Sequence, residues 1–192
     1  DCDFYNLLGN AVFFSRYNRD AEVSGCHFTN IGASAVCFVG DSGAVRSPKF
    51  NYNEPALYAE VDTRKGAMGD NYPAFCRVMD NLIHRIGLFE KQVTGVELSM
   101  CRSITVSHNS IYNTPRSGIN ISEGTWGGHI IEFNDVFDTV KETGDHGSFN
   151  SWGRDRFWSP DYKEMEQFVA EHPEMILADM EEMNIIRNNR FR

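Results

Sequence analysis

The sequence lacks the long apolar runs of a membrane protein and the basic stripes of a nucleic-acid-binding protein. Its longest uninterrupted apolar run, from Ala35 to Val39, has five residues, whereas a membrane-spanning helix needs about 20. We therefore expect no membrane span. The chain carries 18 Lys and Arg against 27 Asp and Glu, a net charge of −9. Because an acidic surface repels phosphate backbones, nucleic acid is not an expected partner.

Patterns typical of metal-binding residues are also missing. The five cysteines are Cys2, Cys26, Cys37, Cys76 and Cys101. They are widely spaced and include no CxxC pair, so a structural zinc site is not expected. We interpret them as small buried apolar side chains. The sequence does not decide whether two of them form a disulfide. No His pair or acidic trio has metal spacing, so we expect neither a metal nor another cofactor.

What the sequence does contain is an internal repeat with a period in the low twenties. Residues 2–14 and 26–38 match at an offset of 24 residues, through the pattern Cys-x-Phe-x-Asn-apolar followed by Ala-Val-x-Phe. Further along, the pattern Asn-x-apolar recurs at Asn81, Asn109, Asn134 and Asn189. Short strands that alternate with period 2 cannot each bury a face alone, whereas stacked coils can.

The repeat predicts an all-β fold, a right-handed parallel β-helix with a short α-helical insertion. Residues 1–192 are expected to form part of a single domain. The Asn residues should stack in one column, because amide side chains can hydrogen-bond at strand spacing. A neighbouring buried column is expected from Val78, Val106 and Ile131. Leucine-rich repeats are disfavoured because the Leu-x-x-Leu-x-Leu spacing is missing, and helical repeats because the period is 2 rather than 3.6.

Both ends of the sequence fall inside the repeat. The chain begins at Asp1, partway through a coil, and ends at Arg192, partway through another. Neither end has a polar capping element, and no signal-peptide pattern is present. We therefore expect the native protein to be longer.

Two stretches interrupt the period. Residues 41–75 are rich in Pro and Gly and are predicted to form a long loop with short strands near 57–61. Residues 156–184 are predicted to form a helical insertion, with Ser159-Pro160 as N-cap and first residue and Pro173 ending the first helix. Most of this insertion, from Pro160 to Met180, should be helical and should cover one side of the coils, burying Phe168 and Ile176. Such excursions often line a binding cleft.

A dense group of polar and aromatic residues lies in the last coils. Ser148-Phe149-Asn150 is interpreted as replacing residues 119–121, so that two inward apolar positions become polar, and such departures often mark functional sites. Around them lie Glu123, Trp126, His129, Asp145, His146, Trp152, Arg154 and Asp155. Glycosidic cleavage generally needs two carboxyl groups, Trp packs on sugar rings, and Arg and Asn hold hydroxyls. Strands about 4.8 Å apart permit the separation of about 5–5.5 Å found in retaining glycosidases.

This region also carries a family resemblance. The run from Asn109 to Trp158 resembles bacterial right-handed β-helix proteins that degrade polysaccharides, and is most similar to glycoside hydrolase family 141, which includes α-L-fucosidase and xylanase activities. The similarity extends from about Ala21 to the closing IRNNRFR. It implies two catalytic aspartates, which Asp145 in Gly-Asp-His-Gly and Asp155 in Trp-Gly-Arg-Asp match best. It also implies that relatives continue past Arg192 into another acid-rich coil.

The resulting hypothesis is an extracellular or periplasmic glycoside hydrolase that acts on a plant or algal cell-wall polysaccharide. Asp145 and Asp155 would be the acid and the nucleophile, and His146 would orient a carboxylate. The sugar or oligosaccharide would be bound by Arg154, Trp152, Trp126, His129, Glu123 and Asn150. A polysaccharide lyase or epimerase with a Lys or Arg base, and a non-catalytic carbohydrate-binding solenoid, stay open as alternatives, as does the oligomeric state. A purely structural use of the aspartates, as a turn cap and an Arg partner, is the competing interpretation.

Overall fold

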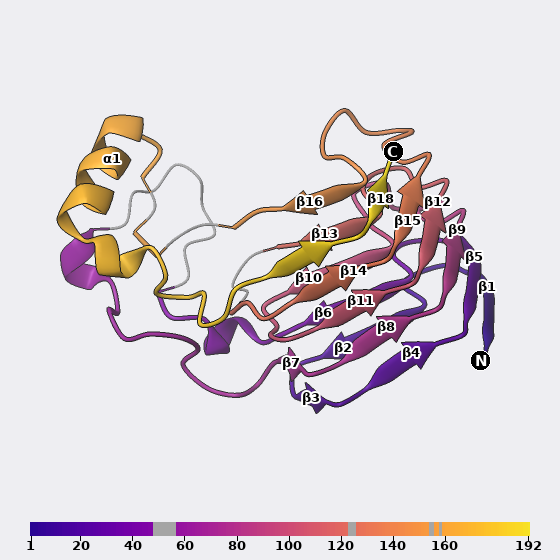
Figure 1. Ribbon diagram of the computed structural model, residues 1–192, viewed down its shortest axis with the longest axis horizontal. Helices are drawn as coiled ribbons and strands as arrows, with labels where there is room; N and C mark the ends of the chain where they lie inside the picture. Colours follow the sequence, from indigo (N-terminus) through magenta and orange to yellow (C-terminus); the bar gives the residue numbers. More distant parts are fainter. Residues whose placement is uncertain (48–56, 123–125, 154–155, 158) are drawn as a thin grey trace.

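The chain winds into a parallel β-helix in which each coil adds one strand to each of three sheets (Figure 1). This computed structural model describes residues 1–47, 57–122, 126–153, 156–157 and 159–192. Every strand pairing within these residues is parallel. The predicted all-β solenoid with a short α-helical insertion is therefore confirmed.

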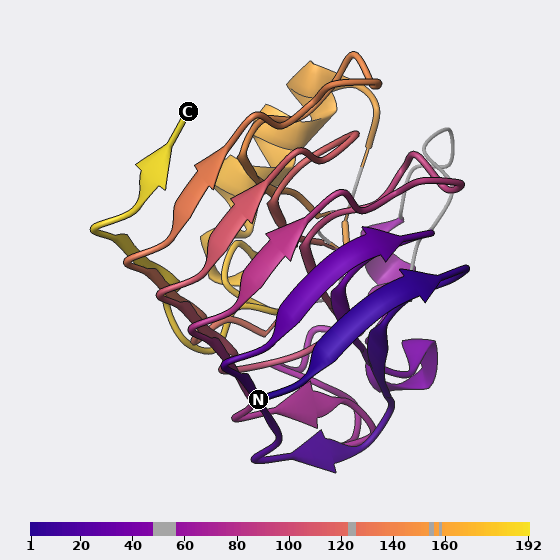
Figure 2. The same cartoon turned by 90° about the vertical axis from the view of Figure 1, so that its right-hand side faces the viewer.

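Three sheets enclose the core, and each is named here after its first strand. The β1 sheet, which faces the viewer in Figure 2, consists of β1 (Asp3–Leu7), β5 (His27–Ile31), β9 (Leu82–His84), β12 (Ser110–Tyr112), β15 (Asp135–Phe137) and β18 (Arg190–Phe191). The β2 sheet consists of β2 (Val12–Ser15), β6 (Val36–Val39), β10 (Val96–Ser99), β13 (Ile119–Ile121) and β16 (Phe149–Ser151). The β4 sheet consists of β4 (Glu22–Ser24), β8 (Arg77–Met79), β11 (Thr105–Ser107), β14 (Ile130–Glu132) and β17 (Ile185–Arg187).

The strand register confirms the 24-residue repeat of the first two coils. Phe4 pairs with Phe28 and stacks on it with ring centroids 4.7 Å apart. Phe14 likewise stacks on Phe38 at 4.8 Å. Each stacked pair adds about 0.5–1.5 kcal/mol beyond the burial of its apolar area. Identical inward residues in consecutive coils therefore set the register as well as fill the core.

The predicted asparagine column is present at the corner between the β4 and β1 sheets. Asn81, Asn109 and Asn134 are at most 3% exposed, and each donates from Nδ2 to Oδ1 of the next asparagine, ending at Asn189. Each Nδ2 also donates to a backbone carbonyl of the preceding coil, and each Oδ1 accepts a backbone N–H from it. The column thus satisfies buried backbone groups where the chain turns.

The neighbouring apolar column is also confirmed. Val78, Val106 and Ile131 pair in register across the β4 sheet and are fully buried. Asn6 and Asn30 of the first two coils belong to a separate and exposed column, where Asn30 donates to Asn6. At the corner occupied by the buried asparagines, the second coil instead has Cys26, whose backbone N–H donates to Asn81.

The coil corners place residues other than glycine in the left-handed backbone region at matching positions. Between the β4 and β1 sheets, φ is 54, 56, 55 and 56° at Asp80, His108, Phe133 and Asn188. Between the β1 and β2 sheets, φ is 55, 52, 54 and 50° at Asn30, Arg85, Asn113 and Asp138. Such a conformation is uncommon outside glycine, but here it recurs because each coil repeats the same corner. His108 and Asp138 therefore hold structural positions.

The first interruption leaves the coils after β6 and returns at β7 (Pro73–Ala74), which pairs with β3 (Asn18–Arg19). Within its described residues, its regular elements are the 3-10 helices η1 (Ser42–Ala44) and η2 (Tyr58–Glu60). The expected strands near 57–61 were therefore wrong, because these residues close a single turn in which Val61 N–H donates to the Tyr58 carbonyl. Tyr72 and Ala74 pack against the buried Trp126 and anchor the excursion to the coils.

The second interruption contains α1 (Tyr162–Glu171) and the 3-10 helix η3 (Pro173–Met175). The N-cap is Asp161, whose carboxylate accepts from the N–H groups of Lys163 and Glu164, rather than Ser159. Beyond α1, the stretch predicted to be helical up to Met180 contains only the short η3, from Pro173 to Met175.

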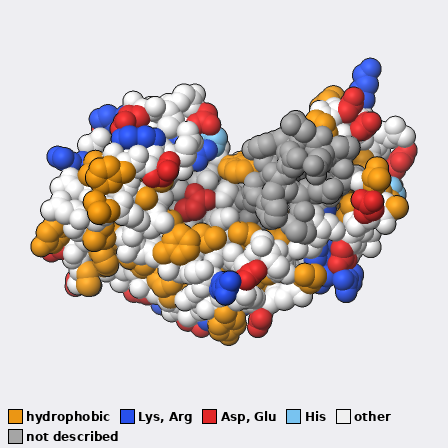
Figure 3. Space-filling model, turned by 180° about the vertical axis from the view of Figure 1, so that it is seen from behind, with side chains coloured by type: hydrophobic (Ala, Val, Ile, Leu, Met, Phe, Trp, Pro, Cys, Tyr) orange, Lys and Arg blue, Asp and Glu red, His pale blue; other side chains and the backbone are white. Residues whose placement is uncertain are grey.

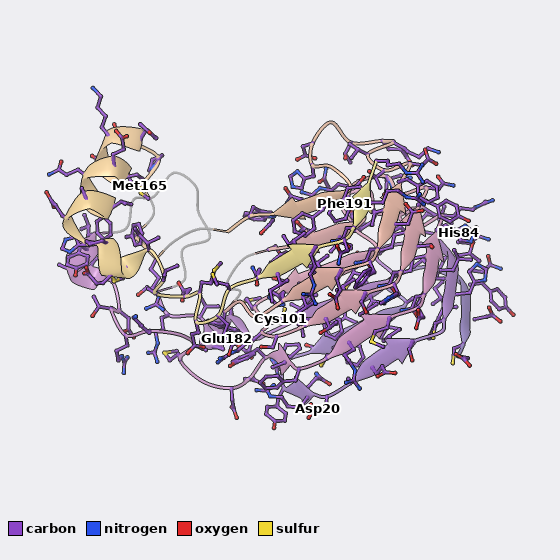
Figure 4. The ribbon with its side chains drawn as sticks, in the orientation of Figure 1. Asp20, His84, Cys101, Met165, Glu182 and Phe191 are labelled. Carbon is purple, nitrogen blue, oxygen red and sulfur yellow. The ribbon has the colours of Figure 1, made fainter. Side chains whose placement is uncertain are left out.

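The expected packing of this insertion was also wrong. Phe168 is only partly buried, and Ile176 is 46% exposed. The apolar side of α1 packs on Val61 and Phe157 instead of on the coils, because the first excursion supplies an apolar partner. Together the two excursions form a small lobe beyond the strand ends, where Figure 4 shows Met165 on α1 at the opposite end of the molecule from His84.

Candidate functional site

The loop before β16 brings two of the predicted catalytic residues together. The Asp145 side chain is 58% exposed, and its carboxylate lies 3.4 Å from Nδ1 of His146. Arg116, from the loop before β13, reaches both residues: its Nε is 3.7 Å from the Asp145 carboxylate, and its guanidinium contacts His146 Nε2. Arg116 is only 15% exposed. An exposed carboxylate is therefore held beside an imidazole by a largely buried cation.

A column of outward polar side chains crosses the β2 sheet next to this loop. Glu97, Asn120 and Asn150 pair in register on β10, β13 and β16, and Cys37 occupies the preceding position on β6. Asn150 donates to Asn120 at 2.7 Å, and Asn120 Nδ2 lies 3.0 and 3.2 Å from the two Glu97 oxygens. We call Cys37, Glu97, Asn120 and Asn150 the polar column.

The Glu97 carboxylate has a further partner in Ser122, whose hydroxyl lies 2.5 Å from it. Burial raises the pKa of Glu97, while the hydrogen bonds from Ser122 and Asn120 and the positive charge of Arg116 act in the opposite direction. Burial also raises the pKa of the neighbouring Cys37 thiol to about 12. Arg116 therefore links the polar column electrostatically to the loop that carries Asp145.

The outward face of the β2 sheet is turned away from the viewer in Figure 1 and towards the viewer in Figure 3. Acidic side chains lie there in a hollow beside the residues drawn in grey. A cleft of about 350 Å³ is lined by Pro115 together with Arg85, Leu88, Lys141 and Glu142, among others.

The register at β16 corrects the predicted polar break. Phe149 pairs with Ile119, Asn150 with Asn120 and Ser151 with Ile121, so the expected alignment was wrong by one position. Ser148 instead corresponds to Gly118, whose N–H donates to the Ser148 carbonyl. Only one inward apolar position becomes polar, at Ser151. Asn150 continues the outward polar column rather than interrupting the core.

Trp126 and His129 are not available to a sugar, contrary to the prediction, because both side chains are fully buried. The Trp126 ring packs against Tyr72 with centroids 4.2 Å apart. His129 Nδ1 accepts the backbone N–H of Ile104 at 3.2 Å, and burial lowers the pKa of this imidazole to about 4. His129 thus accepts a backbone N–H of the preceding coil at another corner, as the buried asparagines do at theirs. In the next coil Asn184 does the same, because its side-chain oxygen accepts the His129 N–H.

The remaining predicted site residues divide into two groups. Trp152 follows β16 and is partly buried, and its backbone N–H donates to the Ile121 carbonyl at 2.9 Å. Glu123, Arg154 and Asp155 lie outside the described residues. Among the described residues, the side chains of the consecutive residues Asp145 and His146 therefore lie next to each other, and Asn150 lies in the polar column.

Sequence reasoning missed Glu97, Asn120, Ser122 and Arg116. A glutamate between two inward apolar residues is usually a solvated charge, and Glu97 has that local pattern. The signal that could have revealed them is the middle position of β10, β13 and β16, which holds Glu, Asn and Asn in consecutive coils. The shared orientation of these three side chains becomes visible only when the coils are in register.

No group of three or more His, Cys, Asp or Glu side chains within the described residues is arranged to hold a metal ion. Cys2, Cys26, Cys37 and Cys76 form no disulfide. In the part of the chain that the structure describes, no helix combines the length and the apolar character that a membrane crossing requires.

The fold and the family comparison agree. The family described as the right-handed beta helix region matches residues 1–142, so the chain belongs to this family. The matched region contains Glu97 and Asn120 and ends shortly before Asp145. No curated protein and no solved structure matches the chain. Polysaccharide-degrading enzymes and other proteins share this fold, so family membership alone assigns no activity.

Proposed function

We propose that this protein is a glycoside hydrolase acting on a polysaccharide at the outward face of the β2 sheet. The observation that carries the proposal is the polar column, which ends beside a loop with a second carboxyl group at Asp145. The partly exposed amide of Asn150 suits a sugar hydroxyl, whereas Asn120 is buried and holds Asn150 and Glu97 in position. Cleavage of a glycosidic bond generally requires two carboxyl groups.

In this site Asp145 would act as one carboxyl group and His146 would orient it. The 3.4 Å separation between His146 Nδ1 and the Asp145 carboxylate supports that role. Arg116 holds the pair in place and would bind a sugar hydroxyl at its exposed edge. Asn150 and Trp152 are the sugar-binding residues that we retain. Asp155 stays a prediction from the family resemblance, and Arg154 and Glu123 stay predictions from the sequence.

The proposed substrate sets the expected location and partners. Plant and algal cell-wall polysaccharides are too large to enter a cell, so we propose an extracellular or periplasmic site of action. The net charge of −9 disfavours nucleic acid as a partner. The resemblance to glycoside hydrolase family 141 makes xylan and fucose-containing polysaccharides the first substrates to test.

The test is product analysis after incubation of the natural full-length protein with a panel of purified polysaccharides. We expect shortened chains whose new reducing ends have gained one water, measured by mass spectrometry. Unsaturated non-reducing ends would instead identify a lyase, and an altered sugar in an uncut chain would identify an epimerase. Binding without any change of mass would identify a carbohydrate-binding solenoid. Each of these last three outcomes contradicts hydrolysis.

The contribution of Asp145 can be isolated with one matched pair of variants. Asp145→Asn should lower hydrolysis of the substrate found in the panel by about 100-fold or more, as expected for loss of an acid or base. Asp138→Asn is the control, because Asp138 is a carboxylate on the preceding corner that pairs with Lys141. Near wild-type turnover in Asp145→Asn would remove Asp145 from the reaction.

A further inference from the structure

Besides Asp145, the proposed site needs a second carboxyl group, and among the described residues the polar column contains one. Glu97 lies at the centre of that column, between Cys37 on β6 and Asn120 on β13. It is the one member of the column that can carry a proton as an acid under ordinary conditions, since Asn120 and Asn150 do not titrate. Its position on a strand, rather than on a loop, fixes it rigidly.

We propose that Glu97 is the proton-donating carboxyl group of the site, held in position by Asn120 and Ser122; this assignment depends on the hydrolase function proposed above. Glu97 faces outward on β10 and is a partly buried residue, with its carboxyl group hydrogen-bonded to Asn120 and Ser122. It therefore lies where a sugar bound across the β2 sheet would place a glycosidic oxygen. A residue in this orientation can contact the substrate, unlike the inward Val96 and Leu98 on either side, which are fully buried.

The hydrogen bonds around Glu97 serve both of its protonation states. When Glu97 is ionised, the Ser122 hydroxyl donates to it at 2.5 Å. When Glu97 is protonated, its own O–H can donate to the Ser122 oxygen, because a hydroxyl both donates and accepts. The Ser122 hydrogen can then turn to the Leu98 carbonyl, which lies 3.4 Å away. Asn120 donates to the carboxyl group in either state.

This arrangement lets Glu97 lose and regain a proton without movement of the backbone. A carboxyl group with a purely structural role, linking β10 to β13, would not need a hydroxyl partner that can both donate and accept a hydrogen bond. The raised pKa of Glu97 agrees with this role, because it favours the protonated form that an acid needs. The charged and titratable groups that act on Glu97 or respond to it are Arg116, Cys37 and Cys101.

The reaction balances with water as the only co-reactant. The proton of Glu97 passes to the glycosidic oxygen as the bond from that oxygen to the anomeric carbon breaks, and one sugar leaves with a hydroxyl group. The hydroxyl of a water molecule bonds to the anomeric carbon. The remaining proton of that water replaces the one lost by Glu97, directly or through the second carboxyl group.

The decisive experiment measures kcat and KM against pH for wild type and Glu97→Gln, with the polysaccharide identified in the panel. Glutamine keeps an acceptor for Asn120 but cannot donate a carboxyl proton. We expect kcat to fall by about 100-fold or more, KM to change by less than about threefold, and the alkaline limb of the kcat profile to disappear. Glu132→Gln is the control, since Glu132 is an outward glutamate on β14 that pairs with Arg187.

A second variant keeps the assignment testable if Glu97→Gln does not fold. Ser122→Ala removes a donor that favours ionised Glu97, so the pKa of Glu97 should rise and the alkaline limb should move to higher pH. A purely structural role would lower stability in both variants and leave the position of that limb unchanged.

The outcomes separate the two proposals. Hydrolysis by wild type, with full kcat and an unchanged alkaline limb in a folded Glu97→Gln protein, would overturn the role of Glu97 alone. Absence of hydrolysis by wild type would overturn both the hydrolase function and the role of Glu97. Loss of kcat together with the alkaline limb in Glu97→Gln, and a shifted limb in Ser122→Ala, would support both.

Discussion

Asn109 donates a 3.0 Å hydrogen bond from its side chain to the side-chain oxygen of Asn134, its counterpart in the next coil. The same amide donates to the Val78 carbonyl of the preceding coil, and the Asn109 oxygen accepts the N–H of Asn81. One side chain therefore joins three consecutive coils at their corner. This relationship explains why asparagine recurs at this position.

Asn109→Ala should destabilise the protein by about 3 kcal/mol or more. The substitution leaves buried groups of Asn81, Val78 and Asn134 without their partner, and each such group costs about 1–3 kcal/mol. Guanidinium unfolding followed by circular dichroism measures the change. Asn30→Gly is the control, because Asn30 makes an exposed hydrogen bond to Asn6 and has a φ of 55° that glycine accepts readily. Equal losses in the two variants would contradict a special role for the buried column.

His129 makes the fold sensitive to acid. Its pKa falls from 6.5 to about 4 on folding, so the neutral imidazole is favoured in the folded protein and its protonation favours unfolding. Stability is therefore fully present above pH 6.5 and is lost progressively down to about pH 4, by roughly 3 kcal/mol. His129→Asn, which copies Asn184 of the next coil, should remove most of this part of the pH dependence. Identical slopes between pH 6.5 and 4 in both proteins would show that His129 is not responsible.

Trp126 should act on stability and not on sugar binding. Trp126→Ala removes the ring that packs against Tyr72 beneath the first excursion, and should cost about 3–5 kcal/mol. Limited proteolysis should then cut within residues 57–72 faster than in wild type. Trp152→Ala provides the comparison, since Trp152 is partly exposed beside the polar column and should raise KM. A higher KM in Trp126→Ala without loss of stability would restore Trp126 as a sugar-binding residue.

Arg156 holds the lobe of the two excursions together. Its side chain is 2% exposed, and its guanidinium donates to the Asp179 carboxylate and to the backbone carbonyls of Asp62 and Ala178. Arg156→Lys cannot reproduce this fork of donors. Hydrogen exchange should therefore speed up in residues 58–68 and 162–178, while the strands of the coils keep their protection. Arg64→Lys, at an arginine that is 73% exposed in the same lobe, should leave exchange unchanged.

Much of the fold could be predicted because each coil of a solenoid repeats the same pattern of inward residues. Inward residues such as Val106 and Ile131 occupy the same position in successive coils, so a fixed offset in the sequence becomes a column in space. The excursions do not repeat, and their packing could not be derived in the same way. Periodicity showed that residues 162–171 are helical, but it did not reveal that Val61 and Phe157 would cover the apolar side of that helix.

The site was predicted less completely, for two physical reasons. Side-chain chemistry indicated Trp126 and His129 as sugar ligands, but only the three-dimensional corner shows that both point into the core. Glu97 and Arg116 come from segments that individually look ordinary. They become parts of one site only because consecutive coils place β10 and β13 side by side.

The most direct test is the crystal structure of Glu97→Gln with an oligosaccharide of the polysaccharide that wild type cleaves. We predict that the sugar lies across the outward face of the β2 sheet, with a hydroxyl within hydrogen-bond distance of Asn150. The glycosidic oxygen should lie within hydrogen-bond distance of the residue 97 side chain. A sugar bound instead in the cleft between Arg85 and Lys141, or on the β4 sheet, with nothing near residue 97, would contradict the proposed site.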